Sequence, residues 1–260
     1  MNLTEKKISD ILKNLKENYN ICALKAEFAS EASEIEEVMR LKELANNFDL
    51  DLAIKIGGCE AVRDINNAKK IGAKIIVAPM IESEYAAKKF LKSAQIVYSK
   101  EEKNTIDLFI NIETICGYNH LENILKQDFA RQLAGIVIGR TDLAHSLGFN
   151  CSDVNNKEIF DYVEKISQIA YKYNKNIVIG GGISAISAPF LKRLKERLTR
   201  IETRKIIFNA DILNSPNFED GILKAIDFEI LWIQNKENYE NLSIQDYNRI
   251  NILKSRRNSV

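Results

Sequence analysis

Two apolar runs that end in acidic motifs decide the fold class of this chain: IDLFINIET at residues 106–114 and GIVIGRTDL at residues 135–143. Each run is typical of a buried strand, because polar and apolar residues do not alternate within it. The first run ends at Glu113, and Asp142 follows the end of the second. In an α/β barrel the C-terminal ends of parallel strands surround one open mouth. We therefore expect the two carboxylates to converge there and to offer oxygen ligands to a hard cation.

Short apolar runs alternate with helical patterns along most of the chain. The other predicted strands, all interpreted as buried and parallel, are residues 21–28, 50–56, 74–79, 176–180 and 204–210. Helical periodicity separates them, as in Ile35–Leu44, where Ser33 and Glu36 have the spacing of a capping box. A β-α repeat of about 30 residues predicts a TIM (β/α)8 barrel. An open doubly wound sheet is the structural alternative.

Seven strands are visible in the sequence, and residues 94–99 and 216–237 are the candidates for the eighth. Apolar residues at helical spacing predict extra terminal helices near residues 8–15 and 244–253. No linker or low-complexity tract divides the chain. We therefore expect a single domain over residues 1–260, with a barrel core at about 20–210 and a helical extension at 211–260.

The composition excludes several classes of partner. Lys and Arg number 37 against 36 Asp and Glu, so no strong net field attracts nucleic acid or a membrane surface. The four cysteines are widely spaced and form neither a zinc motif nor a dithiol pair. The first residues lack the apolar core of a signal peptide, and no apolar run reaches the roughly 18 residues of a membrane span. These features predict a cytoplasmic protein with reduced thiols.

Four motifs together resemble the 2-oxo-acid class II aldolase and citrate lyase β-subunit family. They are KIGGCEAVRD at residues 55–64, VAPMI at 77–81, NIET at 111–114 and GRTDLAHSLG at 139–148. The resemblance extends over roughly residues 20–210, and the two strand ends are its strongest part. It implies that Glu113 and Asp142 bind a divalent metal, and two carboxylates without clustered His or Cys suit Mg²⁺ or Mn²⁺.

The resemblance implies a metal-dependent carbon-carbon lyase. Its substrate would be a 2-oxo acid such as pyruvate, or an aldol adduct of one, and the metal would stabilise the enolate. The family also implies a homo-oligomer. Two alternatives are an acyl-CoA lyase of the citryl-CoA or malyl-CoA type and a non-catalytic protein that binds metal and oxo acid. A structural alternative is that Glu113 and Asp142 merely cap the helices that follow them.

Several residues depart from the family pattern. Lys55 stands where the aldolases carry a substrate-binding Arg, and Asn111 where they carry a Gln, so both are expected to contact substrate. Phe28 occupies the position of the catalytic His, and phenylalanine cannot transfer protons. His145, three residues after Asp142, is the candidate replacement base, and we assign catalytic roles to Lys55 and His145.

The turn that contains Gly139, Arg140 and Thr141 is expected to bind substrate, because backbone N–H groups of this turn contact the substrate carboxylate in the family. The Arg140 side chain is a further candidate contact. A different mechanism remains open for Lys25 and Lys55, since a lysine desolvated near a barrel mouth can form a Schiff base with a carbonyl substrate. In that mechanism the two carboxylates would have no assigned task.

Overall fold

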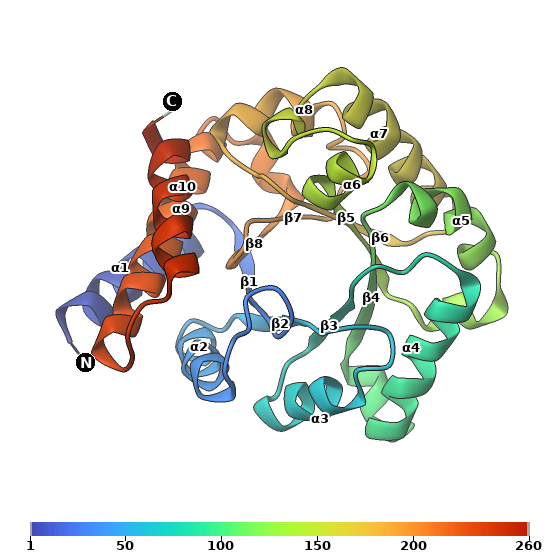
Figure 1. Ribbon diagram of the computed structural model, residues 1–260, viewed down its shortest axis with the longest axis horizontal. Helices are drawn as coiled ribbons and strands as arrows, with labels where there is room; N and C mark the ends of the chain where they lie inside the picture. The colour runs from blue at the N-terminus through green and yellow to red at the C-terminus, as the bar shows by residue number, and fades with distance from the viewer. Residues whose placement is uncertain (1, 259–260) are drawn as a thin grey trace.

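The computed structural model, which describes residues 2–258, contains a closed barrel of eight strands in chain order (Figure 1). The strands are β1 (Ile21–Glu27), β2 (Asp51–Lys55), β3 (Ile75–Ala78), β4 (Asp107–Ile112), β5 (Gly135–Gly139), β6 (Asn176–Gly180), β7 (Arg200–Glu202) and β8 (Ile206–Asn209). From β1 to β7 every neighbouring pair is parallel. The predicted barrel is confirmed, and the open sheet is excluded.

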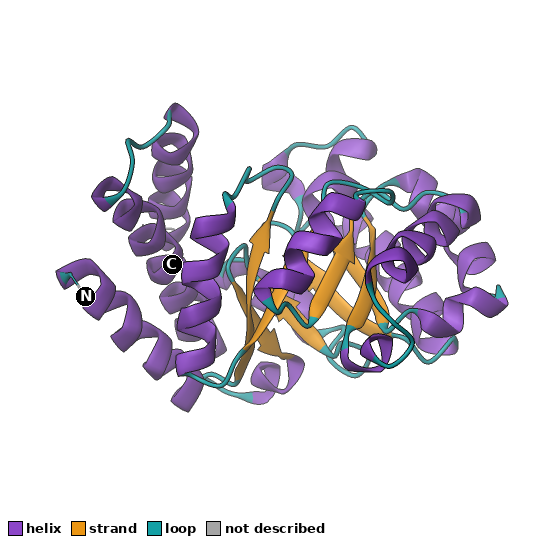
Figure 2. Cartoon of the chain, turned by 90° about the horizontal axis from the view of Figure 1, so that it is seen from below, coloured by secondary structure: helices purple, strands orange, loops and turns teal. Residues whose placement is uncertain are grey.

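Helices cover the outside of the barrel (Figure 2). They are α1 (Leu3–Asn18), α2 (Ile35–Asn47), α3 (Val62–Ile71), α4 (Glu84–Val97), α5 (Ile115–Leu125), α6 (Arg140–Ser146), α7 (Lys157–Lys172), α8 (Ala188–Lys192), α9 (Phe218–Asn235) and α10 (Ile244–Asn258). The terminal helices predicted from apolar spacing are confirmed as α1 and α10. None of the described helices is long and apolar enough to span a bilayer.

The last two strands form a hairpin, and this differs from the prediction. Strand β8 is antiparallel to both β7 and β1. The connection between β7 and β8 is only three residues long, and Thr203 N–H donates to Ile206 O across it. A parallel return would need a crossover of a dozen or more residues. The interpretation of residues 204–210 as a parallel strand was therefore wrong.

The candidates for the eighth strand were also wrong. Residues 94–97 belong to α4, and most of residues 216–237 form α9. The overlooked strand is β7, whose three residues are too short to show a pattern. The capping box at Ser33 is likewise absent, because α2 begins after Glu34 and has no side-chain cap.

Alternate residues of the strands point into the barrel, as the period of two requires. An apolar layer fills the lower interior: Ala23, Ala53, Ile75, Val77, Phe109, Val137, Val178 and Ile207. A larger core lies between the strands and the helices. Two residues further along the strands, the inward-facing side chains are polar instead of apolar. Lys25 is the next inward residue after Ala23, Lys55 after Ala53 and Asn111 after Phe109. The polar site is therefore the layer directly above a closed apolar floor.

Helices α1, α9 and α10 lie together beside β1 and β8 (Figure 1). Tyr19, next to the start of β1, donates to Asp220 at the beginning of α9. At the opposite end of α9, Asn2 donates to Asn235. Helix α9 thus rises from the floor of the barrel toward its mouth, and α10 returns along it.

The packing of the floor predicts that Gly135→Ala destabilises the protein by about 2–3 kcal/mol, since overpacking a filled core has a cost of this size. A Cβ atom at this position would lie 2.6 Å from Cε1 of Phe109 and would also collide with the backbone of Asn176. Urea unfolding followed by circular dichroism measures the difference.

Gly58→Ala is the matched control, because a Cβ atom there has no neighbour within 4 Å. We expect its effect to stay within about 0.5 kcal/mol. Equal stability of the two variants would contradict the tight packing of the barrel floor around Gly135.

Candidate active site

A cavity of about 500 Å³ opens at the mouth of the barrel, within the usual range for small-molecule sites of about 300–1,000 Å³. The barrel contributes to its wall Lys25, Glu27, Lys55, Asn111, Glu113, Gly139, Thr141, Asp142 and Glu202. Predicted site residues from β2, β4 and the β5–α6 turn are thus brought together at one place.

Glu113 is held rigidly at the centre of this wall and is only 2% exposed. Its Oε1 accepts a hydrogen bond from Met80 N–H at 3.0 Å, and its Oε2 accepts one from Asn111 Nδ2 at 2.7 Å. Burial raises the pKa of Glu113, and the negative charge of Asp142 adds to the rise, whereas Lys55 opposes it. The two carboxylates therefore interact electrostatically across the mouth.

Two inward-facing glycines make room for the buried carboxylates. A Cβ atom at Gly139 would lie 2.7 Å from Oε2 of Glu113, and one at Gly180 would lie 2.9 Å from Oε1 of Glu202. Only glycine leaves these inner positions of β5 and β6 empty. The side chains of Glu113, which directly follows β4, and of Glu202 in β7 occupy the space.

Lys55 stands between two carboxylates. Its Nζ lies 3.3 Å from Oε1 of Glu27 and 3.6 Å from Oε2 of Glu113. Burial by itself lowers the pKa of Lys55, but the charges of Glu113, Glu27 and Asp142 outweigh it, and the net shift is upward. Lys55 is therefore a cation at neutral pH, which suits it to bind an anion and makes it a poor amine nucleophile.

Asp142 lies in the first turn of α6 and lines the cavity. Within residues 2–258 its carboxylate accepts no hydrogen bond and forms no ion pair. Glu113 does not cap the next helix either, because Thr114 is the N-cap of α5 and accepts from Gly117 N–H. The structure thus gives no support to the alternative that these two acids are helix caps.

Asn111 has an unsatisfied acceptor in the wall of the cavity. Its amide nitrogen donates to Glu113, and this bond fixes the orientation of the side chain. Its Oδ1 is buried and has no partner among the described residues. A buried polar atom without a partner is costly, so it marks a position where a ligand hydroxyl or a water would be bound.

The proposed base lies elsewhere. His145 is exposed on α6, outside the set of described residues that line the cavity, and its Nε2 is 3.0 Å from Sγ of Cys151. Phe28 follows the inward-pointing Glu27, so its side chain packs against the core outside the barrel. Phe28, which we expected at the position of the family's catalytic His, therefore does not face the cavity.

Arg140 does not offer its side chain to the cavity, and this corrects the idea of a substrate contact. The guanidinium is completely buried and donates to the carbonyl groups of Gly180 and Gly181 and to Oδ1 of Asn155. It also lies over the ring of Phe190 at 4.8 Å. Burial lowers the pKa of Arg140 to about 9, which still leaves it charged at neutral pH. Its side chain ties the β5, β6 and α8 loops together.

The C-terminal helices contribute residues that were not predicted as site residues. They are Ile226 and Glu229 of α9 and Arg249, Ile252, Leu253 and Arg256 of α10. No motif marks them, since they lie beyond the β-α repeat and reach the mouth only because α10 folds back along α9. Glu202 was missed because β7 was missed.

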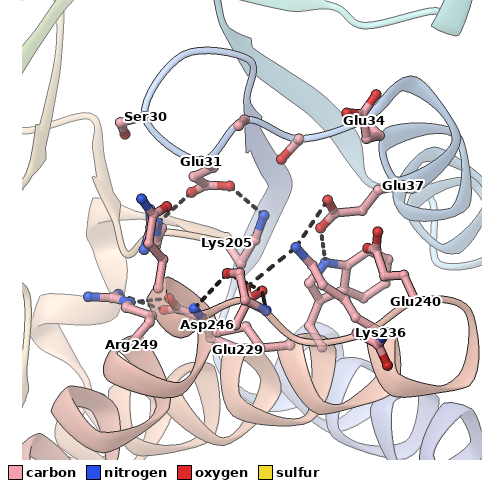
Figure 3. A pocket seen from close by; sticks show the side chains of 18 residues that line it. Ser30, Glu31, Glu34, Glu37, Lys205, Glu229, Lys236, Glu240, Asp246 and Arg249 are labelled. Atoms are coloured by element: carbon pink, nitrogen blue, oxygen red, sulfur yellow. Dashed lines mark hydrogen bonds and ion pairs between the residues drawn. The ribbon is translucent and has the colours of Figure 1, made fainter.

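A second cavity, of about 290 Å³, lies beside the first, between the β1–α2 loop and helices α9 and α10 (Figure 3). Its charges neutralise one another. Glu31 contacts Arg204 at 2.7 Å and Lys205 at 2.6 Å, and Lys236 contacts Glu37 and Asp246. The Glu31 pairs join the β1–α2 loop to the β7–β8 turn, and the Lys236 pairs connect the C-terminal end of α9 to α2 and α10.

The barrel mouth offers two carboxylates to a divalent cation. No group of three or more His, Cys, Asp or Glu within residues 2–258 is arranged to hold a metal. Mg²⁺ and Mn²⁺, however, are commonly bound through one or two carboxylates, with waters and substrate oxygens as the other ligands. Glu113 and the unpartnered Asp142 fit this type of site.

A sequence model of the HpcH/HpaI aldolase/citrate lyase family matches residues 28–182, which is more than half of the chain. The chain belongs to this family. The match includes β2 to β6 and therefore also Lys55, Asn111, Glu113 and Gly139. No curated protein sequence matches the chain significantly.

Solved structures that include members of the HpcH/HpaI aldolase/citrate lyase family are similar in fold to this chain. An HpcH/HpaI aldolase from Desulfitobacterium hafniense is 11% identical, with a TM-score of 0.63, and 91% of this chain and 90% of that chain are covered. A family protein from Burkholderia cenocepacia is 15% identical, with a TM-score of 0.61 and coverage of 85% and 90%. The citrate synthase SbnG is 16% identical, with a TM-score of 0.57 and coverage of 72% and 78%. At these identities the similarity concerns the fold alone.

The buried hydrogen bonds of Arg140 predict that Arg140→Met destabilises the protein by about 3 kcal/mol, because several loop carbonyl groups lose a charged donor. Urea unfolding measures the loss. Arg131→Met is the control, since Arg131 forms only an exposed ion pair with Asp128 and should change stability by less than about 1 kcal/mol. A stable Arg140→Met protein with a selectively weakened substrate affinity would instead indicate a substrate contact.

The charge state of Lys55 predicts that pyruvate forms no Schiff base with the protein. The pKa of Lys55 is raised, so its ammonium form persists at neutral pH and is lost only as the pH rises through that raised value. Incubation with pyruvate and borohydride at pH 7 should leave the mass of the protein unchanged. A reduced adduct mapped to Lys55 or Lys25 would establish the Schiff-base mechanism. It would also contradict the anion-binding role assigned to the Lys55 ammonium.

Proposed function

We propose that the protein is a divalent-metal-dependent carbon-carbon lyase that acts on a 2-oxo acid such as pyruvate or on its aldol adduct. Membership of the aldolase/citrate lyase family gives the class of reaction. The observation that supports this reaction most directly is that the carboxylates of Glu113 and Asp142 line the same cavity. One carboxylate is fixed by two donors, and the other has no partner within residues 2–258.

The proposed cation ligands are Glu113 and Asp142, and the proposed ion is Mg²⁺ or Mn²⁺. When bound, such an ion supplies Lewis-acid stabilisation of negative charge on the 2-oxo oxygen of the substrate. Lys55 also contacts Glu27, so its ammonium keeps a counterion when Glu113 is engaged elsewhere. A buried charge that remains paired avoids a large desolvation cost.

The residues around the two carboxylates have complementary proposed roles. Lys55 neutralises the substrate carboxylate, although an ammonium lacks the bidentate geometry of a guanidinium. Oδ1 of Asn111 accepts a hydrogen bond from the hydroxyl group of the aldol adduct. Gly139 and Thr141 line the same wall and position the carboxylate end of the substrate. These contacts hold the bond to be broken next to the developing negative charge.

The proton of the adduct hydroxyl needs an acceptor when the bond breaks. No imidazole lies among the described residues that line the cavity. Glu113 and Asp142 are assigned to the cation, and Glu202 is paired with Lys25. Glu27 is likewise paired, with Lys55, but Lys55 is the lysine assigned to the substrate carboxylate, so we assign proton transfer to Glu27 in place of His145. A homo-oligomeric state and a cytoplasmic location stay predictions.

The proposal predicts that Glu113→Gln lowers the rate of pyruvate methyl-proton exchange in D₂O by at least about 100-fold in the presence of Mg²⁺ or Mn²⁺. Exchange reports enolate formation and needs no second substrate. The neutral amide keeps the size of the side chain but loses the charge that binds the cation, and one such electrostatic contact is worth roughly 100- to 1,000-fold. Proton NMR measures the exchange, and Mn²⁺ electron paramagnetic resonance measures metal affinity.

Glu101→Gln is the control, because Glu101 is exposed and precedes β4, at the other end of the barrel from the cavity. Metal binding without any exchange in the wild type would favour the non-catalytic alternative. Turnover of citryl-CoA or malyl-CoA without exchange of free pyruvate would favour the acyl-CoA lyase.

A further inference from the structure

The mouth cavity is larger than the part that a three-carbon oxo acid would use. One wall carries Glu113, Asp142 and Lys55, and the other carries α9 and α10. The second wall presents apolar side chains from Ile226, Ile252 and Leu253 next to the guanidinium of Arg256. Such a surface suits a short carbon chain with a charged end. The second reactant, the aldehyde acceptor, would occupy this half of the cavity.

The three arginines near this wall differ in their ion pairs. Arg204 contacts Glu31 at 2.7 Å. Arg249 forms two hydrogen bonds to Glu229, at 2.6 and 3.0 Å, and Figure 3 shows this pair beside the second cavity. Arg256 has no hydrogen bond or ion pair with any residue in the described range 2–258. Among these three arginines, Arg256 is therefore the one whose charge is not neutralised by an ion pair. It is also half-buried.

The surroundings of Arg256 disfavour an isolated positive charge. Burial lowers the pKa of Arg256, and Arg249 lowers it further, whereas Glu229 and Cys151 oppose this change. Its backbone is nevertheless held in place, because the adjacent Arg257 forms two hydrogen bonds to Asp227 of α9, at 2.5 and 3.2 Å. A half-buried guanidinium that lacks an anion and lines a cavity is a binding group for a carboxylate or phosphate.

We propose that Arg256 binds an anionic group, a carboxylate or a phosphate, at the far end of the acceptor aldehyde, and thereby selects acceptors with a terminal negative charge. This inference rests on the proposed lyase function. In this arrangement Lys55 binds the carboxylate of the oxo acid at one end of the cavity, and Arg256 binds the second anion at the other. The apolar residues of α9 and α10 contact the carbon chain between them.

The test compares acceptors of similar size with and without a negative charge. Succinic semialdehyde is paired with butanal, and glyceraldehyde 3-phosphate is paired with glyceraldehyde. Each is supplied with pyruvate and Mg²⁺ or Mn²⁺, and kcat/KM is measured for condensation. We expect the wild type to prefer the charged member of at least one pair, and the preferred pair identifies the anion as carboxylate or phosphate.

In Arg256→Gln, the ratio of kcat/KM for the charged acceptor to that for its neutral partner should fall about 10- to 100-fold, the range expected for one charge-assisted hydrogen-bonding group. Arg256→Lys should restore part of the ratio, because it keeps the charge without the planar fork. Lys254→Gln is the matched control and should leave the ratio unchanged, since Lys254 is an exposed cation of α10 outside the set of described residues that line the cavity.

Pyruvate proton exchange by the wild type distinguishes a failure of the Arg256 acceptor site from a failure of the proposed lyase function. Exchange together with a charge preference that Arg256→Gln does not alter overturns the role of Arg256 and leaves the lyase function standing. Exchange with no preference for charged acceptors also overturns it. The absence of exchange under all metal conditions overturns the lyase function, and the acceptor site with it.

Discussion

The need to pair charges inside a barrel governs the structure of the mouth. Glu27, Glu113 and Glu202 enter the interior with little exposure to water, and a buried carboxylate without a partner would cost several kcal/mol. Two lysines from adjacent strands meet this requirement, because Lys25 pairs with Glu202 and Lys55 pairs with both Glu27 and Glu113. Asp142 is left outside these pairs. The charge balance of the layer thus leaves one acidic group available to a ligand, and the strand geometry determines which one.

The height of this layer in the barrel follows from strand alternation. Ala23, Ala53 and Phe109 close the interior below it, so a ligand can enter only from the rim, and the lower barrel stays dry. Glycines at 139 and 180 provide the space into which the neighbouring glutamates extend. Each buried glutamate therefore depends on the glycine opposite it for space. A larger side chain at either glycine would move the carboxylate that the chemistry requires.

The sequence was sufficient for the barrel and for the convergence of residues 113 and 142 on one cavity, because unbroken apolar runs and helical periodicity are local signals. The sequence was insufficient where contacts between distant residues determine the direction of a strand or the position of a side chain. The three residues of β7 carry no pattern of their own, and the turn at 203–205 makes β8 antiparallel through its shortness alone. The burial of Arg140 depends on loops that are distant in the sequence. The arrival of α10 at the cavity depends on ion pairs with α9, and the metal and substrate roles remain proposals.

The reversed last strand has an electrostatic consequence at the rim. Because β8 ends at the floor, α9 runs upward, and its carbonyl end lies near the mouth, where the helices that follow parallel strands present their amide ends. The macrodipole of α9 therefore brings a partial negative charge of about half an electron to this sector of the rim. Lys236 at the C-cap of α9 is a cation of the sign that such a helix terminus attracts. One short hairpin thus inverts the local field on the side of the entrance where α10 closes back over the barrel.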